Sequence, residues 1–419
     1  MNKPSFEKKN LKNLISKPLA AILAAVMVIA SLCACGNNTE QTTAEQTAET
    51  NVTAETTAEN GSDAADDGQV KPLEGAAYQN AKFDSVVLDY DEQEFEDAGY
   101  TFGDSVDVEF SNGYSLTDIP YLNGYYVRTG EPVLVAYPGN SAVEVTLNNV
   151  GLWTQAGLEY GDTAKVSLNT QGKYLVTYET FSQKYSHDRD QFETDEQFAN
   201  FRALSGGNLK ENFLYRGVTP FNNLYERAET AGKLIEEAGI NCIVDLADSN
   251  AEIEELLKEN TFDSAYAKKI FEDGHVEALA LGSQYMTDTY KEGVAAGVRK
   301  MLECGGPCYI HCMEGKDRTG FVCMLLEAFA GASYDEMCAD YMKTYENYYG
   351  ITREKTPEKY EAVVSLYFDA FMEYLSGSVD REVITQADYS DAAGQYLMEG
   401  GLTDEEIEKL QEMILVSEE

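Results

Sequence analysis

Basic residues and long apolar runs are scarce in this sequence. Its 419 residues hold 31 Lys and Arg against 73 Asp and Glu, so the formal net charge is −42. A protein that binds nucleic acid or anionic membranes through its overall charge needs the opposite sign, and we therefore expect no nucleic-acid partner. No stretch after the N-terminal segment is apolar enough to span a bilayer. The hydrophobic fraction of 43% still suffices for a core, and the length predicts two domains, or one domain with extensions.

Cysteine and histidine are too few and too unevenly placed for a disulfide scaffold or a zinc site. The chain has 8 Cys and 3 His. All cysteines beyond Cys35 lie in the C-terminal half, whereas a disulfide scaffold would spread them along the chain. The histidines are not combined with cysteine pairs at zinc-ligand spacing. The sequence therefore predicts no metal site.

The N-terminus has the pattern of an export signal. A lysine-rich segment precedes an apolar run from Leu19 to Leu32, which has the length of a signal peptide. The run ends in Leu-Cys-Ala-Cys-Gly over residues 32–36, which resembles the lipobox of bacterial lipoproteins. The resemblance implies that residues 1–34 are a signal peptide and that the thiol of Cys35 is diacylated, so we expect an extracytoplasmic protein held at a bacterial membrane by its lipid. An ordinary secretory signal that happens to contain cysteine is the alternative.

Composition divides the following part of the chain into a tether and a β domain. Residues 35–76 are rich in Thr, Ala and acidic residues and are expected to be a disordered tether. Residues 77–185 show short apolar or alternating runs separated by Gly, Pro and Asn, which predicts a small all-β, barrel-like domain. Residues 181–212 are polar and are expected to form a linker with some helix. Four of the expected strands are Val133–Tyr137, Val143–Leu147, Ala164–Leu168 and Tyr174–Tyr178.

Residues 200–419 show strands that alternate with helices. Cys242–Leu246 and Cys308–His311 are expected strands, and Thr319–Ala330 is an expected apolar helix. This alternation is typical of an α/β fold with a parallel sheet and flanking helices. Near the end of the chain, Thr403 and Glu406 have the spacing of a capping box that starts a helix.

Residues 311–320, with the sequence His-Cys-Met-Glu-Gly-Lys-Asp-Arg-Thr-Gly, lie between an expected strand and an expected helix. A loop that enters a helix points several backbone N–H groups at one spot, and the helix dipole makes that spot favourable for an anion. Cys312 at the start of the loop would have its thiolate stabilised by these donors and would act as a nucleophile. Arg318 can turn back across the loop and bind two oxygens of a phosphate. Nucleophile and anion-binding group thus converge on one small pocket.

This segment resembles the His-Cys-x5-Arg-Thr loop of the cysteine-dependent protein tyrosine phosphatases. Residues 315–320, Gly-Lys-Asp-Arg-Thr-Gly, look like the loop of bacterial tyrosine and dual-specificity phosphatases of the secreted or lipid-associated type. Phe213–Gly217, Gly239–Leu246 and Asp340–Thr344 resemble further segments of this family. The resemblance covers about residues 205–375 and implies a cysteine phosphatase domain that needs neither a metal nor another cofactor.

The resemblance also implies a role for each residue of the loop. Cys312 would attack phosphorus and form a phosphocysteine intermediate, while Arg318 holds the equatorial oxygens. Thr319 would donate its hydroxyl to the departing sulfur, and His311 would orient the loop. Asp317 is the first candidate for the general acid, with Asp288 as the alternative. The other expected phosphate-binding positions are Met313, Glu314, Gly315, Lys316 and Arg216.

Two positions depart from the family pattern. Glu314 stands where the family often has Ala, and a carboxylate there opposes anion binding unless it points outward or pairs with a base. The strand before the first crossover reads Asp245-Leu-Ala247, where the family often has Asp-Leu-Arg. The missing arginine leaves Arg216 as the candidate for a further cation near the site.

The sequence therefore predicts a protein tyrosine or dual-specificity phosphatase. A phosphoinositide or inositol-phosphate phosphatase that uses the same loop is the alternative within enzymes, and a phospho-ligand-binding module without turnover is the alternative outside them. The expected partners are accordingly a phosphorylated protein or a phospholipid headgroup.

Overall fold

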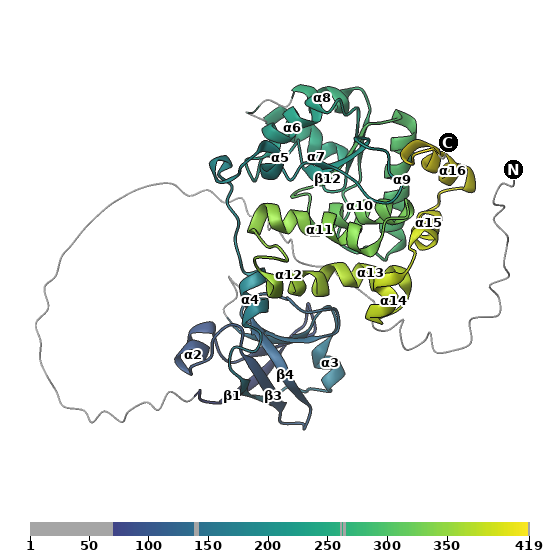
Figure 1. The fold of residues 1–419 in the computed structure, drawn as a ribbon. Helices are drawn as coiled ribbons and strands as arrows, with labels where there is room; N and C mark the ends of the chain where they lie inside the picture. Colours follow the sequence, from purple (N-terminus) through teal and green to yellow (C-terminus); the bar gives the residue numbers. More distant parts are fainter. Residues whose placement is uncertain (1–69, 138–141, 260–261, 263–264, 418–419) are drawn as a thin grey trace, which may run out of the picture.

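The computed structural model of this chain describes residues 70–137, 142–259, 262 and 265–417. A barrel domain and a larger α/β domain lie next to each other, with α4 and α12 at their contact (Figure 1). The expected signal peptide, the lipidation site Cys35 and most of the expected tether lie outside the described residues. In the part of the chain that the structure describes, no helix is both long and apolar enough to cross a membrane.

The first domain is a closed barrel of seven strands in the order β1-β2-β6-β5-β4-β3-β7, as the turn-rich sequence predicts. In β3, Val106, Val108 and Phe110 are buried whereas Asp107 and Glu109 are not, which is the alternation of a strand with one face on a core. The strands are β1 (Leu73–Asn80), β2 (Ser85–Leu88), β3 (Ser105–Phe110), β4 (Ser115–Leu122), β5 (Pro132–Val135), β6 (Glu144–Leu147) and β7 (Thr163–Thr170), with helices α2 (Glu92–Asp97) and α3 (Leu152–Ala156) between them. The barrel therefore begins at Leu73, inside the segment expected to be tether.

The strand expected at Tyr174–Tyr178 is wrong, because this segment forms helix α4 (Leu175–Phe181). β7 already pairs with both β1 and β3, so the closed barrel offers no free edge to a further strand. The apolar side chains instead repeat at helical spacing. Tyr178 stacks on Phe102 of the barrel with ring centroids 5.1 Å apart, while Phe181 contacts Tyr367 of the α/β domain at 5.4 Å. Packing against both domains therefore stabilises a helix here, although the β-branched residues of the segment favour a strand.

The second domain is built on a five-stranded sheet with the order β11-β10-β12-β9-β8. Four of the five strands are parallel, namely β9 (Leu214–Val218), β10 (Cys242–Asp245), β11 (Val276–Ala278) and β12 (Cys308–Cys312). The fifth strand, β8 (Arg202–Ala203), pairs with β9 in the antiparallel sense. The expected mixed α/β architecture is thus confirmed. The helices are α5 (Asp195–Phe198), α6 (Ala228–Glu237), α7 (Asn250–Glu259), α8 (Ala265–Glu272), α9 (Asp288–Cys304), α10 (Asp317–Phe329), α11 (Tyr334–Tyr349), α12 (Pro357–Val363), α13 (Asp369–Ser376), α14 (Arg381–Gln386), α15 (Ser390–Glu399) and α16 (Asp404–Ile414), with the π-helical turn η3 (Val364–Phe368) between α12 and α13.

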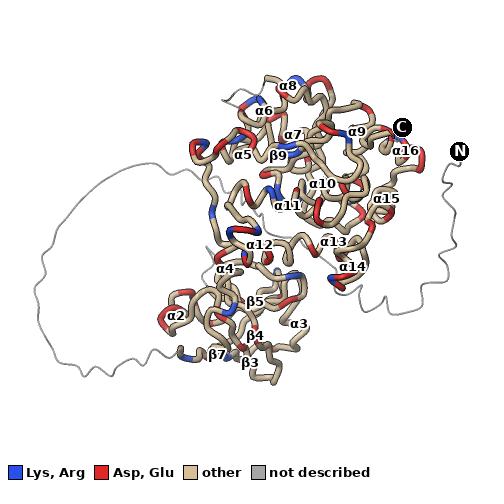
Figure 2. Tube along the Cα trace, viewed as in Figure 1, with Lys and Arg blue, Asp and Glu red and all other residues tan. Residues whose placement is uncertain are grey.

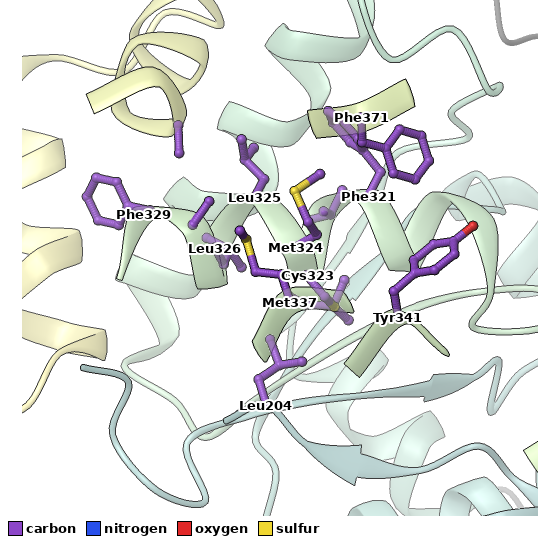
Figure 3. Packing of buried hydrophobic residues seen from close by; sticks show 14 of the residues in the cluster. Leu204, Phe321, Cys323, Met324, Leu325, Leu326, Phe329, Met337, Tyr341 and Phe371 are labelled. Atoms are coloured by element: carbon purple, nitrogen blue, oxygen red, sulfur yellow. The ribbon is translucent and has the colours of Figure 1, made fainter. Parts of the chain in front are cut away.

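Helix α10 lies at the centre of the larger core. Every residue of α10 from Thr319 to Phe329 is buried, because the helix packs against β12, α11 and α15 at once. Figure 3 shows side chains of α10, Phe321, Leu325 and Phe329 among them, spreading in different directions into this cluster. Burial of one such side chain contributes roughly 1.5–3 kcal/mol, so the core holds the start of α10 firmly in place.

The two domains meet through charged and aromatic contacts. Arg128, in the loop after β4, donates to both carboxylate oxygens of Glu373 at 2.8 and 2.9 Å and to the backbone oxygen of Ser365. Tyr126 of the same loop packs on Phe181, with ring centroids 5.4 Å apart. Acidic positions recur along the traces of both domains (Figure 2), as the net charge leads one to expect.

Candidate active site

The segment 311–320 forms the expected strand–loop–helix connection. β12 ends at Cys312, whose side chain is buried, and α10 begins at Asp317. The side chain of the N-cap residue Lys316 makes no capping hydrogen bond at the N-terminus of α10. The first N–H groups of the helix are therefore available to an anion at the end of the loop.

The sharp turn of the loop requires glycine at position 315. Gly315 has φ of +67°, and a Cβ there would lie 2.3 Å from the backbone oxygen of Gly217. The backbone oxygen of Gly315 accepts hydrogen bonds from Arg216 at 2.9 Å and from Asn200 at 3.1 Å. Met313, two residues earlier, is half-buried and accepts from the backbone N–H of Thr219 at 3.4 Å. These contacts hold the loop against the edge of the sheet.

The structure corrects the expectation that Arg216 binds phosphate. Its guanidinium is buried, donates to Gly315 and forms an ion pair with Asp340 of α11. Arg202 of β8 binds the other carboxylate oxygen of Asp340 at 2.6 Å. Burial alone would raise the pKa of Asp340, but Arg202 and Arg216 outweigh it and lower that pKa, so the carboxylate stays ionised. Arg216 is thus a positioning residue behind the loop.

Sequence reasoning missed Arg202 and Asn200, which complete this network. Asn200 donates to Thr344 at 3.1 Å and accepts from Arg202 at 2.8 Å. Asp340 and Thr344, which contact these two residues, lie in a segment that resembles the family. That resemblance is the signal that could have prompted a search for a buried basic residue such as Arg202.

Arg318 lies in the first turn of α10, where its position along the loop predicts it. Its Nη1 donates to the backbone oxygens of Leu281 at 2.9 Å and Leu246 at 3.3 Å. Leu246 directly follows β10, and Leu281 follows β11 in the chain. The carboxyl ends of two neighbouring strands therefore orient the guanidinium at the end of the sheet where the loop lies.

His311 and Asp245 form a buried pair beneath the loop. Burial lowers the pKa of His311 to about 4, so its imidazole is neutral near neutral pH. The His311 Nδ1 lies 3.3 Å from the backbone oxygen of Cys312 and 3.8 Å from Asp245 Oδ1. Burial raises the pKa of Asp245 to about 7 even though its Oδ1 accepts hydrogen bonds from the backbone N–H groups of Ala247 and Asp248. His311 is therefore in position to fix the loop through hydrogen bonding rather than through charge.

Thr319 presents a polar atom with no partner. Its Oγ1 is buried and has no hydrogen-bond partner among the described residues. Buried hydroxyls are rarely left unpaired in folded proteins. This atom is therefore available to a ligand or to a neighbouring sulfur, as the role expected for Thr319 requires.

Glu314, Lys316 and Asp317 form a largely buried charge cluster in the loop. Lys316 Nζ lies 4.0 Å from Glu314 Oε2 and 3.8 Å from Asp317 Oδ2. Burial alone would lower the pKa of Lys316, but the two carboxylates raise it well above its usual range. Burial raises the pKa of Asp317, with Lys316 acting in the opposite direction, so this carboxyl keeps its proton to a higher pH than an exposed aspartate. A buried acid that holds its proton is suited to general acid catalysis.

The barrel domain comes close to this cluster. Burial raises the pKa of Tyr126, and the nearby charge of Lys316 opposes that rise, so the two side chains lie within electrostatic reach. Burial likewise raises the pKa of Tyr367, which contacts Phe181. The charge of Asp317 raises this pKa further, whereas the charge of Lys316 lowers it. The aromatic residues Tyr126 and Tyr367 at the domain contact thus lie within electrostatic reach of this cluster.

Asp288, the alternative general acid, is exposed at the first position of α9. Thr287, the residue before it, caps the helix, because its side chain accepts a hydrogen bond from the backbone N–H of Tyr290. In the described ranges no hydrogen bond or ion pair joins Asp288 to the loop. The geometry therefore favours Asp317. No group of three or more His, Cys, Asp or Glu within the described residues is arranged to hold a metal ion.

Comparison with known proteins agrees with the geometry of the loop. This chain is 29% identical over 119 residues to the triple specificity protein phosphatase PtpB of Mycobacterium tuberculosis. The matched segment covers 25% of this chain and 41% of that protein. The chain therefore matches less than half of that relative's length. A solved structure of an uncharacterized conserved protein from Thermotoga maritima covers 23% of this chain and 38% of its own at 18% identity, and its TM-score of 0.20 supports no conclusion about the fold. The sequence pattern of the tyrosine phosphatase family matches residues 196–416, more than half of the sequence and all of the loop. The chain therefore belongs to the tyrosine phosphatase family.

Proposed function

We propose that this protein is a cysteine-dependent phosphatase that hydrolyses phosphotyrosine, and other phosphorylated protein side chains to a smaller extent. The observation that carries the proposal is the loop between β12 and α10, which joins a buried cysteine, an uncapped helix N-terminus and Arg318 in one place. Membership of the tyrosine phosphatase family supports it, and so does the name of the mycobacterial relative.

The residues of the loop account for a two-step reaction. In the first step the Cys312 thiolate attacks phosphorus, the bond between phosphorus and the ester oxygen breaks, and Asp317 gives its proton to the departing oxygen. In the second step water attacks the phosphocysteine, Asp317 accepts a proton from that water, and the sulfur leaves. The unpartnered hydroxyl of Thr319 would donate to this sulfur. Arg318 would bind the equatorial oxygens in both steps.

The charges around the loop favour a phosphorylated side chain over a polyanionic inositol phosphate. Lys316 is already balanced by the carboxylates of Glu314 and Asp317, and Arg216 is engaged with Asp340 behind the loop. A ligand with several phosphates needs several cations that face the pocket. Arg318 and the helix N-terminus suit a single phosphate group.

The experiment is a comparison of substrates with a matched inactive variant. A soluble protein that begins near residue 70 is assayed with thiol reductant and chelator on phosphotyrosine, phosphoserine and phosphothreonine peptides and on phosphoinositides, beside Cys312→Ser. We expect release of phosphate that is fastest from phosphotyrosine, unaffected by the chelator and lost in the variant, while the variant still binds the phosphopeptide. Faster release from phosphoinositides would replace the proposed substrate, and binding without release by the folded, reduced protein would favour a phospho-ligand-binding module.

We also propose that the protein is lipidated at Cys35 and held outside the bacterial cytoplasmic membrane. The support is the lipobox-like segment at residues 32–36 and the acidic segment that follows it. Expression of the full chain in a bacterium fed with an alkyne fatty acid should label the protein and place it in the membrane fraction. Cys35→Ser should abolish the label, whereas Cys33→Ser should retain it; equal labelling of both variants would contradict the proposal.

A further inference from the structure

The carboxylate of Glu314 is held by a side chain from outside the catalytic loop. The Tyr185 hydroxyl donates to Glu314 Oε1, while Glu314 Oε2 faces Lys316. The side chain of Glu314 is only 12% exposed, so these contacts are its main surroundings. Burial raises the pKa of Tyr185, and the neighbouring carboxylate raises it further, which keeps the phenol protonated as a donor. Glu314 thus has a fixed orientation in the loop.

Tyr185 belongs to the segment between the two domains and precedes residues 196–416, which match the family. Its ring stacks on Tyr348 of α11 with centroids 4.6 Å apart and meets Tyr349 edge-on at 5.4 Å. The Tyr348 hydroxyl donates to the backbone oxygen of Glu314 at 2.7 Å. Two stacked tyrosines therefore hold the side chain and the backbone of the same loop residue.

Arg227 anchors this interdomain segment to the α/β domain. The guanidinium lies 4.4–5.2 Å from the ring centroids of four aromatic residues, Tyr185, Phe192, Phe198 and Tyr348. It also donates to the backbone oxygen of Ser186 at 2.7 Å. Its Nε and Nη1 are buried without hydrogen-bond partners among the described residues, so the rings supply the attraction that compensates for burial. The hydroxyl of Tyr185 is therefore presented to the loop by a rigid support.

We propose that Tyr185 is a positioning residue that keeps the Glu314 carboxylate turned away from the phosphate-binding side of the loop. The inference rests on the proposed function, since it assumes that a phosphate dianion binds at the N-terminus of α10. It explains how a loop with a carboxylate at position 314 can still bind an anion. It also makes the segment before residue 196 part of the active site.

Loss of the Tyr185 hydroxyl should weaken phosphate binding through Glu314 alone. Once released, the carboxylate can approach the helix N-terminus and compete with phosphate for the backbone donors. A unit charge moved to within several ångströms of a dianion changes binding on the order of tenfold in a partly shielded site. Replacement of Glu314 by glutamine removes the charge and should remove the need for Tyr185.

The test is a double-variant cycle with Tyr185→Phe, Glu314→Gln and their combination in the chain from residue 70. We expect Tyr185→Phe to raise KM for a phosphotyrosine peptide about tenfold and to change kcat by less than about twofold. In the Glu314→Gln background the same change should alter KM by less than about twofold. Tyr160→Phe, on an exposed barrel tyrosine, is the matched control for loss of a hydroxyl. An equal rise in KM in both backgrounds, or no rise in either, would overturn the proposal.

A binding measurement separates this inference from the proposed function. The dissociation constant for inorganic phosphate is measured calorimetrically for each variant with Cys312→Ser also present, so that no turnover is needed. A tenfold weakening by Tyr185→Phe that disappears with Glu314→Gln supports the positioning role even if no substrate is hydrolysed. Unchanged phosphate binding in Tyr185→Phe overturns the positioning role even if the protein is an active phosphatase, and absence of phosphate binding in every variant overturns both.

Discussion

The barrel and the α/β domain both bury charged side chains, but the partners of these side chains differ in kind. In the barrel, Glu144 accepts hydrogen bonds from Ser85 at 2.9 Å and from Asn80 at 3.2 Å, which stand on or beside the neighbouring strand. Asp104 accepts from Thr101 and Gly172 and thereby joins two turns. Among the residues that the structure describes, these carboxylates meet hydroxyl, amide and backbone donors and no buried arginine.

In the α/β domain, several buried charged side chains support the loop at residues 311–320. Arg202 and Arg216 share the carboxylate of Asp340, and Arg216 continues to the backbone oxygen of Gly315. Arg227 supports the tyrosine pair that holds Glu314. In the barrel, these buried polar groups thus join neighbouring strands and turns, whereas in the larger domain they hold the loop at residues 311–320 in place.

The largest expected effect comes from removal of Asp340, because it leaves two buried arginines without their carboxylate. Asp340→Ala should destabilise the α/β domain by about 3–5 kcal/mol. Urea unfolding followed by far-ultraviolet circular dichroism reports mainly the helices of that domain. Fluorescence of the single tryptophan, Trp153 in helix α3, reports the barrel. We expect the unfolding transition seen by circular dichroism to move to a lower urea concentration. The transition seen by Trp153 fluorescence should move much less.

Glu144→Gln in the barrel is the matched comparison. The amide keeps one acceptor for Ser85 or Asn80, so the cost should be about 1–2 kcal/mol and should be seen in the fluorescence of Trp153. A larger effect for Glu144→Gln than for Asp340→Ala would contradict the contrast between the domains.

Asp245 should make the stability of the α/β domain depend on pH. Its pKa in the folded protein is about 7, above its usual value of 3.8, so the stability that its protonated form contributes is present below pH 4 and is lost as the pH rises to 7. Asp245→Asn keeps an acceptor for Ala247 and does not titrate. The variant should therefore gain stability relative to the unaltered protein between pH 4 and pH 7, by at most about 4 kcal/mol. Urea unfolding at several pH values measures this gain.

His311, whose pKa is lowered, contributes stability that rises with pH over the same range, so the effect of Asp245 is taken from the difference between the two proteins. A constant difference in stability between the two proteins from pH 4 to pH 7 would show that Asp245 is ionised in the fold.

Asp317→Asn should lower kcat for phosphotyrosine peptides about a hundredfold, since the departing oxygen loses its proton donor. Burial raises the pKa of Asp317, so the activity of the unaltered protein should fall on the alkaline side as this group loses its proton. That alkaline decline should be absent from the variant's pH profile of kcat. Asp288→Asn is the control, and a larger loss there would exchange the two assignments.

Thr403→Ala should have the smallest effect, about 1 kcal/mol, because it removes a helix cap far along the chain from the loop. In the structure Thr403 accepts from the backbone N–H of Glu406, and Glu406 in return accepts from the backbone N–H of Thr403. Circular dichroism during thermal unfolding should show a slightly lower midpoint with kcat unchanged. A loss of activity in the folded variant would mean that α16 influences the loop.

Local patterns predicted the elements that carry the loop, because a buried strand and an apolar helix each show as a run of consecutive apolar residues. The strand expected at Cys308–His311 is β12, the helix expected at Thr319–Ala330 is α10, and the capping box at Thr403 is present. The supporting contacts were out of reach of such patterns. Arg216 and Asp340 are 124 residues apart, and Tyr185 and Glu314 are 129 apart, so only the folded chain shows that they meet.

The most direct test of the phosphocysteine mechanism is to trap the reaction intermediate. The protein is mixed with a radiolabelled phosphotyrosine peptide, quenched with acid within milliseconds, digested and analysed for labelled peptides. We expect transient label on the peptide that contains Cys312, its absence from Cys312→Ser, and its longer persistence in Thr319→Ala, where the departing sulfur lacks a hydroxyl donor. Turnover of the peptide without any label on Cys312, or label that persists in Cys312→Ser, would contradict the phosphocysteine mechanism.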